Sequence, residues 1–251
     1  MRQAGHDSRE AQLDPGYERH LCDRFAWVRE QVELACARSS RKPSEVEVVC
    51  VSKTVGTSEV LAAFEAGFTH FAENRPQELV RKLEELQDAP ELEQMTFDMI
   101  GNLQTNKINQ VLGRARMIHS ISSEHLAQAV SKRALVRDLR VPCLLEVNVS
   151  GEKSKGGMTP DECREAAERI AALDGLDVQG LMTMAPKGDA DAARRSFCGL
   201  RELADDLTTR TGLDLPRISC GMSDDFVIAV EEGSTLIRLG RVVFSQDYEV
   251  R

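Results

Sequence analysis

The stretch Val46-Glu47-Val48-Val49-Cys50-Val51-Ser52-Lys53-Thr54-Val55-Gly56 decides between two α/β folds. Its first seven residues form an apolar run that predicts a buried β-strand. An open, doubly wound sheet that binds a dinucleotide carries the pattern G-x-G-x-x-G directly after such a strand. Gly56 is the only glycine in this stretch, so the sequence favours a closed barrel over the open sheet.

Similar apolar runs alternate with amphipathic stretches along the rest of the chain. Eight runs predict strands, at 46–52, 70–72, 96–100, 117–121, 141–149, 178–184, 217–220 and 235–239. Seven stretches between them predict helices, at 58–66, 76–86, 104–112, 124–136, 160–173, 190–209 and 223–232. Strands that alternate with helices form parallel sheets through right-handed crossovers. Eight such units predict a single (β/α)₈ TIM barrel.

The N-terminal part of the chain adds one element to this pattern. Residues 1–16 are polar and without periodicity, which predicts a disordered tail. Between 17 and 38 the apolar residues recur every three or four positions, which predicts an extra N-terminal helix. We therefore expect one continuous domain over 17–251.

Composition excludes several classes of protein. The formal charge is −9 and aromatic residues make up 4%, whereas nucleic-acid binding needs a basic patch and stacking rings. No apolar stretch reaches the roughly 20 residues that cross a bilayer, so we expect a cytoplasmic protein without a membrane partner. The seven Cys include no CxxC pair and are expected to be reduced. The five His lack metal-ligand spacing, so we expect no metal centre and interpret His119 as a hydrogen-bonded interior residue.

The carboxyl ends of the predicted strands are where a barrel binds its ligands, and phosphate often lies at the loops after strands 7 and 8. The seventh strand leads into Ser219-Cys220-Gly221-Met222-Ser223-Asp224-Asp225, and the eighth into Leu239-Gly240-Arg241. Glycine and free helix N–H groups suit an anion. Ser223 followed by two acids is equally typical of an ordinary helix start with Ser as the N-cap. A phosphate site also requires both Asp side chains to point away.

Lys53 ends the first strand, and in a closed barrel this strand lies beside the eighth. The lysine should therefore adjoin the phosphate loops. A lysine in such a place is a candidate Schiff-base former. A phosphate next to a reactive lysine indicates pyridoxal 5′-phosphate (PLP), with a Schiff-base sugar-phosphate aldolase as the competing interpretation.

An ordered series of motifs over about 50–244 resembles the pyridoxal phosphate homeostasis proteins, also called YggS or PLPBP proteins. The motifs are CVSKT at 50–54, FAEN at 71–74, MIGNLQTNK at 99–107, NVSGEKSKGG at 148–157, GLMTMAP at 180–186, GMSDD at 221–225 and GSTLIRLG at 233–240. That family resembles the N-terminal barrel of alanine racemase, the fold type III of PLP proteins. The racemase's C-terminal β domain is not expected here, because only 251 − 239 = 12 residues follow Leu239.

The resemblance implies a role for seven residues. Lys53 matches the lysine that forms the Schiff base with PLP, and Arg238 matches the arginine that faces the pyridine nitrogen. An arginine cannot give that nitrogen a proton, which disfavours carbanion chemistry and agrees with a carrier. The positions around the phosphate, largely through backbone N–H groups, and in the pocket are Ser219, Met222, Ser223, Gly240 and Asn74.

Two alternatives and several departures qualify these roles. Asn74 is equally readable as a helix N-cap before Pro76. Lys155, in the glycine-rich loop after the fifth strand, is interpreted as a solvated loop lysine, with contact to a second cofactor or a partner as the alternative. The chain departs from the family pattern at Arg241, Ser245 and Asp247, where the family usually has Thr, Gly and a later Arg, and also at Asp98, where histidine is common.

The resemblance implies a non-catalytic, monomeric protein that holds PLP and serves intracellular PLP homeostasis. PLP-dependent client apo-enzymes are the implied protein partners. A PLP-dependent racemase-type enzyme remains the alternative, and it needs a second acid or base on the opposite face of the ring.

Overall fold

A computed structural model describes residues 13–250 of the chain. Most of the predicted tail, residues 1–12, lies outside the described residues, as does residue 251. The first helix, α1 (Pro15–Arg38), begins two residues before the predicted start at 17. Proline suits the first position of a helix, because its missing N–H has no partner within the helix. The Asp14 side chain accepts a hydrogen bond from the Gly16 N–H at 3.2 Å and caps the helix.

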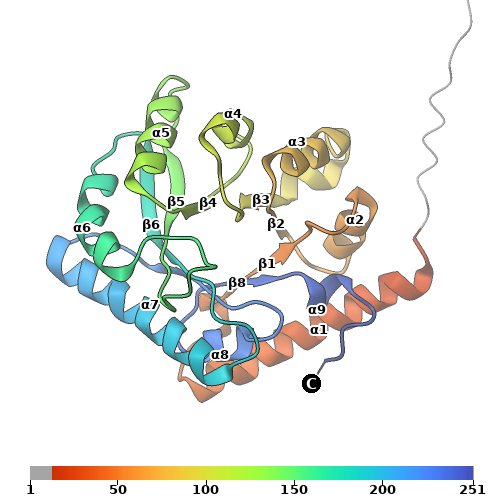
Figure 1. Cartoon of the computed structure of the whole chain (residues 1–251). Helices are drawn as coiled ribbons and strands as arrows, with labels where there is room; N and C mark the ends of the chain where they lie inside the picture. The colour runs from red at the N-terminus through yellow and green to blue at the C-terminus, as the bar shows by residue number, and fades with distance from the viewer. Residues whose placement is uncertain (1–12, 251) are drawn as a thin grey trace, which may run out of the picture.

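Eight parallel strands close into a barrel in chain order, as the alternating pattern predicts (Figure 1). The strands are β1 (Glu47–Val51), β2 (His70–Glu73), β3 (Thr96–Met99), β4 (Ile118–Ile121), β5 (Val141–Glu146), β6 (Leu176–Met182), β7 (Arg217–Ser219) and β8 (Leu236–Leu239). Closure occurs between β1 and β8, where Cys50 pairs with Leu239. The predicted barrel is therefore confirmed, and the open sheet is excluded.

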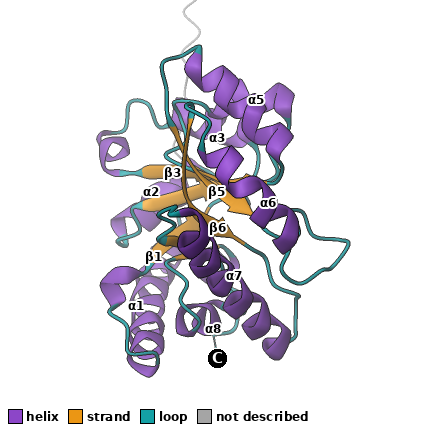
Figure 2. Ribbon diagram, turned by 90° about the vertical axis from the view of Figure 1, so that its left-hand side faces the viewer, coloured by secondary structure: helices purple, strands orange, loops and turns teal. Residues whose placement is uncertain are grey.

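Helices surround the strands (Figure 2). After α1 they are α2 (Thr57–Glu65), α3 (Pro76–Glu85), α4 (Ile108–Val111), α5 (Glu124–Leu135), α6 (Pro160–Ala171), α7 (Ala190–Thr211), α8 (Phe226–Glu231) and α9 (Arg241–Phe244). Three 3₁₀ turns cover Pro43–Glu45, Pro90–Gln94 and Thr105–Lys107. The helix predicted over 104–112 is thus divided into a 3₁₀ turn and the short α4. Within 13–250, no helix is long and apolar enough to cross a membrane.

Two apolar clusters build the core. The larger one lies between the strands and the helices, and it includes Phe71, Leu79 and Phe197. The smaller one fills the inside of the barrel with side chains from the strands and from the residue before β4, namely Val49, Ala72, Met117, Leu144, Met182 and Leu236. Residues two apart on a strand face the same side. His119 and Arg238 therefore share the barrel interior with Met117 and Leu236.

The extra helix α1 packs beside α8, α9 and α2 (Figure 1). Its side chains bind the C-terminal segment: the Tyr17 hydroxyl donates to Phe244 O at 3.2 Å, and Arg24 donates to Tyr248 O at 2.5 Å. Helix α1 therefore supports the loop that follows β8. All seven cysteines are free thiols, as expected, and five of them are buried.

Candidate functional site

Lys53 lies two residues beyond β1, at the carboxyl end of the barrel, and its side chain is exposed. The β1–β2 register pairs Val51 with Ala72, so two residues further along Lys53 is level with Asn74. The β1–β8 register pairs Cys50 with Leu239, which places Gly240 beside Val51. The predicted neighbourhood of Lys53 and the last loop is confirmed.

The residue before Lys53 is held by a buried ion pair. Lys82 of α3 forms a short contact with the Glu73 carboxylate and donates to the Ser52 carbonyl oxygen at 2.5 Å. The Ser52 hydroxyl donates to the same Glu73 carboxylate at 2.7 Å. All three side chains are at most 1% exposed. The peptide unit that carries Lys53 is thereby fixed in direction, although the lysine itself is free to reach outward.

Asn74 follows β2 and is half-buried. Helix α3 begins at Pro76, with Arg75 as its N-cap and no side-chain cap bond. The interpretation of Asn74 as an N-cap is therefore wrong. The Asn74 backbone packs closely on Gly101, where an added Cβ would lie 2.1 Å from the Asn74 carbonyl oxygen. Asn74 lies two residues after Ala72, which faces the barrel interior, and side chains two residues apart along a strand point to the same side. This agrees with a pocket position for Asn74.

The loops after β7 and β8 are joined directly. The backbone N–H of Arg238 donates to the Gly221 carbonyl oxygen at 2.9 Å, and the backbone N–H of Val242 donates to the Ser223 hydroxyl oxygen at 3.1 Å. Gly221 adopts φ +89°, where an added Cβ would lie 2.5 Å from Ala229 Cβ. A glycine is therefore required at this turn. The predicted convergence of the two loops is confirmed.

Several hydrogen-bond donors at this junction are available to an anion. Among residues 13–250, the backbone N–H groups of Ser223, Gly240 and Arg241 have no acceptor. The Ser223 hydroxyl accepts from Val242 and keeps its own proton to donate. The Met222 N–H is already used, because it donates to Asp225 Oδ1 at 2.6 Å. The Met222 side chain is 37% exposed at the same loop.

The carboxylates of the two acidic residues after Ser223 already have hydrogen-bond partners. Arg241 donates to Asp224 Oδ2 at 2.5 Å, and the Tyr248 hydroxyl donates to Asp224 Oδ1 at 3.0 Å. Burial opposes ionisation of Asp224, but these two bonds lower its pKa. Burial raises the pKa of Asp225, whose carboxylate accepts from the Met222 N–H. Helix α8 begins at Phe226, so the interpretation of Ser223 as its N-cap is wrong.

Arg238 lies beneath the mouth of the barrel and is 4% exposed. Its guanidinium donates to the Ser219 hydroxyl at 2.6 Å and to the Thr183 carbonyl oxygen at 2.9 Å. No carboxylate among residues 13–250 hydrogen-bonds to it, and burial lowers its pKa. A buried cation without a carboxylate partner favours an electron-rich ligand group beside it.

Comparison with known proteins assigns the chain to a family. Residues 28–247 match the family described as alanine racemase, N-terminal domain. A pyridoxal phosphate homeostasis protein from Aquifex aeolicus is 36% identical over 228 residues, which cover 90% of this chain and 98% of that protein. The chain belongs to the pyridoxal phosphate homeostasis protein family.

Two solved structures are similar to this family member throughout. The crystal structure of an unknown protein from Bifidobacterium adolescentis has a TM-score of 0.87 and 35% identity, and the match covers 93% of this chain and 98% of that one. PipY from Synechococcus elongatus, solved with PLP bound, has a TM-score of 0.79 and 31% identity, over 90% of this chain and all of PipY.

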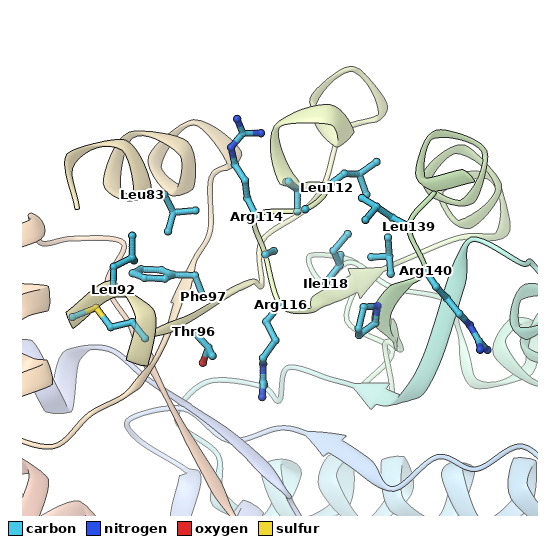
Figure 3. A pocket seen from close by; sticks show the side chains of 16 residues that line it. Leu83, Leu92, Thr96, Phe97, Leu112, Arg114, Arg116, Ile118, Leu139 and Arg140 are labelled. Carbon is cyan, nitrogen blue, oxygen red and sulfur yellow. The ribbon is translucent and has the colours of Figure 1, made fainter. Parts of the chain in front are cut away.

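A cavity of about 550 Å³ lies away from these residues (Figure 3). Its lining includes Thr96 and Val141, which begin β3 and β5, and Arg116, which precedes β4. It therefore opens at the amino ends of the strands, on the face opposite Lys53. None of the seven predicted site residues lines it.

Sequence reasoning missed two buried groups behind the site. The first is the Glu73–Lys82 pair described above. The second is Asp98, which accepts from His119 Nε2 at 2.9 Å inside the barrel. His119 itself was correctly interpreted as a hydrogen-bonded interior residue. Strand parity could have placed Asp98 and His119 inside the barrel, but it could not have paired them.

Proposed function

We propose that this protein binds PLP as a Schiff base on Lys53 and buffers or delivers the cofactor without substantial turnover. Residues 17–251 form one PLP-binding unit that works as a monomer in the cytoplasm. The observation that carries the proposal is the place of Lys53, at the carboxyl end of β1 beside Asn74 and the joined loops after β7 and β8. The PLP-bound PipY structure supports it.

The phosphate group of PLP suits the donors at the junction of the two loops. The free N–H groups of Ser223, Gly240 and Arg241 supply hydrogen bonds, and the Ser223 hydroxyl adds another. Bonds from backbone N–H groups hold a phosphate without a nearby lysine. The Arg241–Asp224 ion pair removes the repulsion that an unpaired carboxylate would exert. Met222 contributes its exposed side chain rather than its N–H, which Asp225 occupies.

The ring nitrogen of PLP suits the Arg238 guanidinium. When bound, PLP supplies an aldehyde for Schiff-base formation and an aromatic ring that can accept electrons. Arg238 donates a hydrogen bond to the nitrogen and keeps its proton. The Ser219 hydroxyl accepts a hydrogen bond from the Arg238 guanidinium and so helps to hold it in place. Without a proton on the nitrogen the ring is a weaker electron acceptor, which agrees with a carrier.

The exposure of Lys53 suits release of the cofactor. A lysine at the rim can be reached by an attacking amine, including a lysine of a client apo-enzyme. A PLP-dependent client is therefore the proposed recipient.

Addition of PLP to the purified protein tests the proposal. After unbound PLP is removed by gel filtration, we expect a near-visible absorbance band in the wild type and in Lys155→Ala, and no such band in Lys53→Ala. Lys155 is the matched control because it lies in the loop after β5 and pairs weakly with Glu152 at 3.9 Å. A band that survives Lys53→Ala contradicts the proposal.

Two further measurements separate the alternatives. A racemase-type enzyme exchanges the Cα hydrogen of an amino acid for solvent deuterium at a catalytic rate, whereas a carrier exchanges it slowly. A sugar-phosphate aldolase uses Lys53 without any PLP chromophore. A PLP chromophore would therefore exclude the aldolase, and a slow exchange rate would exclude the racemase.

A further inference from the structure

Four polar side chains from different strands form one hydrogen-bonded row inside the barrel. Arg238 of β8 lies 2.6 Å from the Ser219 hydroxyl of β7, and that hydroxyl lies 3.0 Å from Nδ1 of His119 on β4. His119 Nε2 lies 2.9 Å from Asp98 Oδ2 on β3. No member of this row is more than 4% exposed. We call these four residues the interior row.

The interior row has only one consistent direction of donation. A guanidinium has donors and no acceptor, so the Ser219 oxygen must accept from Arg238. The single Ser219 proton finds an acceptor in the row only when its other neighbour, His119 Nδ1, carries no proton. The proton of a neutral imidazole therefore lies on Nε2 and is donated to Asp98. Burial lowers the pKa of His119, which agrees with the neutral ring.

Asp98 is the acceptor at the end of the row. Its carboxylate also accepts from His70 Nε2 at 2.6 Å and from two nitrogens of Arg116 at 3.1 and 3.2 Å. Burial opposes ionisation, but the bonds from His119 and His70 hold the pKa of Asp98 well below its usual range. Asp98 is therefore a fixed anion that binds the proton on His119 Nε2.

The alternative tautomer would weaken the support of Arg238. With a proton on Nδ1 of His119, the Ser219 oxygen would accept from two donors, and its own buried proton would have no acceptor in the row. The lone pair of His119 Nε2 would also face the Asp98 carboxylate. A buried donor without an acceptor costs free energy, so Ser219 would hold the Arg238 guanidinium less firmly beside its other contact, the Thr183 carbonyl oxygen.

We propose that Asp98 and His119 are positioning residues for the cofactor site, because they fix the tautomer that lets Ser219 hold Arg238 toward the ring nitrogen of PLP. This proposal rests on the proposed function. The contacts among Ser219, His119 and Asp98 resemble those of a hydrolytic triad. Ser219 is nevertheless fully buried, and its oxygen is occupied by a guanidinium, so its role is to support Arg238.

Nuclear magnetic resonance of protein labelled with ¹⁵N in histidine tests the tautomer without any cofactor. The His119 signals are assigned by their loss in His119→Gln. We expect a neutral ring with the proton on Nε2 from pH 7 to pH 9. A proton on Nδ1, or an imidazolium at pH 7, overturns the proposal. This measurement uses the wild-type protein, so its result does not depend on whether an Asp98 variant folds.

A pair of variants then tests the link to the cofactor. In Asp98→Asn we expect a mixture of His119 tautomers and a PLP dissociation constant raised about tenfold, the size of a weakened hydrogen bond to a charged group. Glu47→Gln is the matched control, because Glu47 contacts His70, Arg116 and Arg217 but not His119. It should change neither quantity more than about twofold.

The possible results distinguish this proposal from the proposed function. An unchanged tautomer in Asp98→Asn, or a changed tautomer with unchanged PLP affinity, overturns the positioning role. Absence of PLP binding by the wild type overturns the proposed function, and with it the role toward PLP. In that case the ¹⁵N measurement still decides whether the interior row has the inferred direction.

Discussion

Arg241 donates to Asp224 at 2.5 Å across the two loops that follow β7 and β8. The family usually has Thr at the position of Arg241, so this ion pair belongs to the chain's departures from the family pattern. The pair places the Arg241 charge on a carboxylate beside the proposed phosphate site. We therefore expect Arg241 to protect the proposed site from repulsion.

Replacement of Arg241 by Thr should weaken PLP binding. The Asp224 carboxylate then faces the phosphate without a counter-charge, and the dissociation constant should rise about two- to fivefold, because both side chains are partly exposed. Titration with PLP measures the change. The double variant Arg241→Thr, Asp224→Asn should bind as well as the wild type. Tighter binding by Arg241→Thr alone would mean that Arg241 obstructs the site.

Replacement of Gly221 by Ala should destabilise the fold strongly. The residue has φ +89°, and an added Cβ would lie 2.5 Å from Ala229 Cβ, so we expect a loss of about 2–4 kcal/mol in the free energy of unfolding. Gly212 at the end of α7 is the control, since it has φ +73° but open space around the new Cβ. Gly212→Ala should cost only about 1 kcal/mol. Equal losses in urea unfolding would refute the crowding at Gly221.

Removal of the Lys82 charge should also destabilise the protein. Lys82→Met leaves the fully buried Glu73 carboxylate without its cation, which typically costs about 3–5 kcal/mol. Arg81→Met on the same helix is the control, because Arg81 pairs with Glu78 and Glu85 at the surface. It should change stability by no more than about 0.5 kcal/mol. Similar unfolding midpoints for both variants would show that the buried pair does not stabilise the fold.

Stability should depend on pH through His70. Burial lowers its pKa, but hydrogen bonds to Asp98 and Glu47 outweigh this, so the pKa is raised from 6.5. The contribution of protonated His70 is therefore fully present below pH 6.5 and is lost as the pH rises through the folded-state value. The stability difference between wild type and His70→Gln should shrink from pH 6 to pH 9.

His20 provides the opposite case for the same measurement. Burial lowers the pKa of His20 from 6.5, and its hydrogen bond to Val243 O does not compensate. The stabilising contribution of neutral His20 is present above pH 6.5. It is lost as the pH falls below 6.5 and through the lower pKa of His20 in the folded state. Urea unfolding of His20→Gln should therefore show the reverse trend. The same trend for both variants would contradict the contacts assigned to His70.

The barrel could be predicted from the sequence because each strand is an apolar run with a side-chain period of two. The ends of strands and helices were harder to predict where polar residues lie at them. The run over 141–149 ends as a strand at Glu146, with Val147 forming only an isolated bridge to Met158. The helix predicted from 223 begins at Phe226, because Met222 and Asp225 form a turn before it.

Contacts across the barrel could not be predicted in the same way. Strand parity places Asp98, His119 and Arg238 inside the barrel, but their relative heights depend on the stagger between strands, which a single sequence does not show. The Glu73–Lys82 pair likewise depends on how α3 packs on β2. The proposed ligand positions could be predicted, whereas the groups that hold them could not.

Reduction of the PLP-loaded protein with borohydride, followed by peptide mapping, tests the assignment of Lys53 most directly. Borohydride converts a Schiff base into a stable amine, so the modified lysine can be identified by mass. We predict a pyridoxyl group on Lys53 and none on Lys155. Bound PLP with an adduct on another lysine, or with no adduct at all, would contradict the proposed role of Lys53.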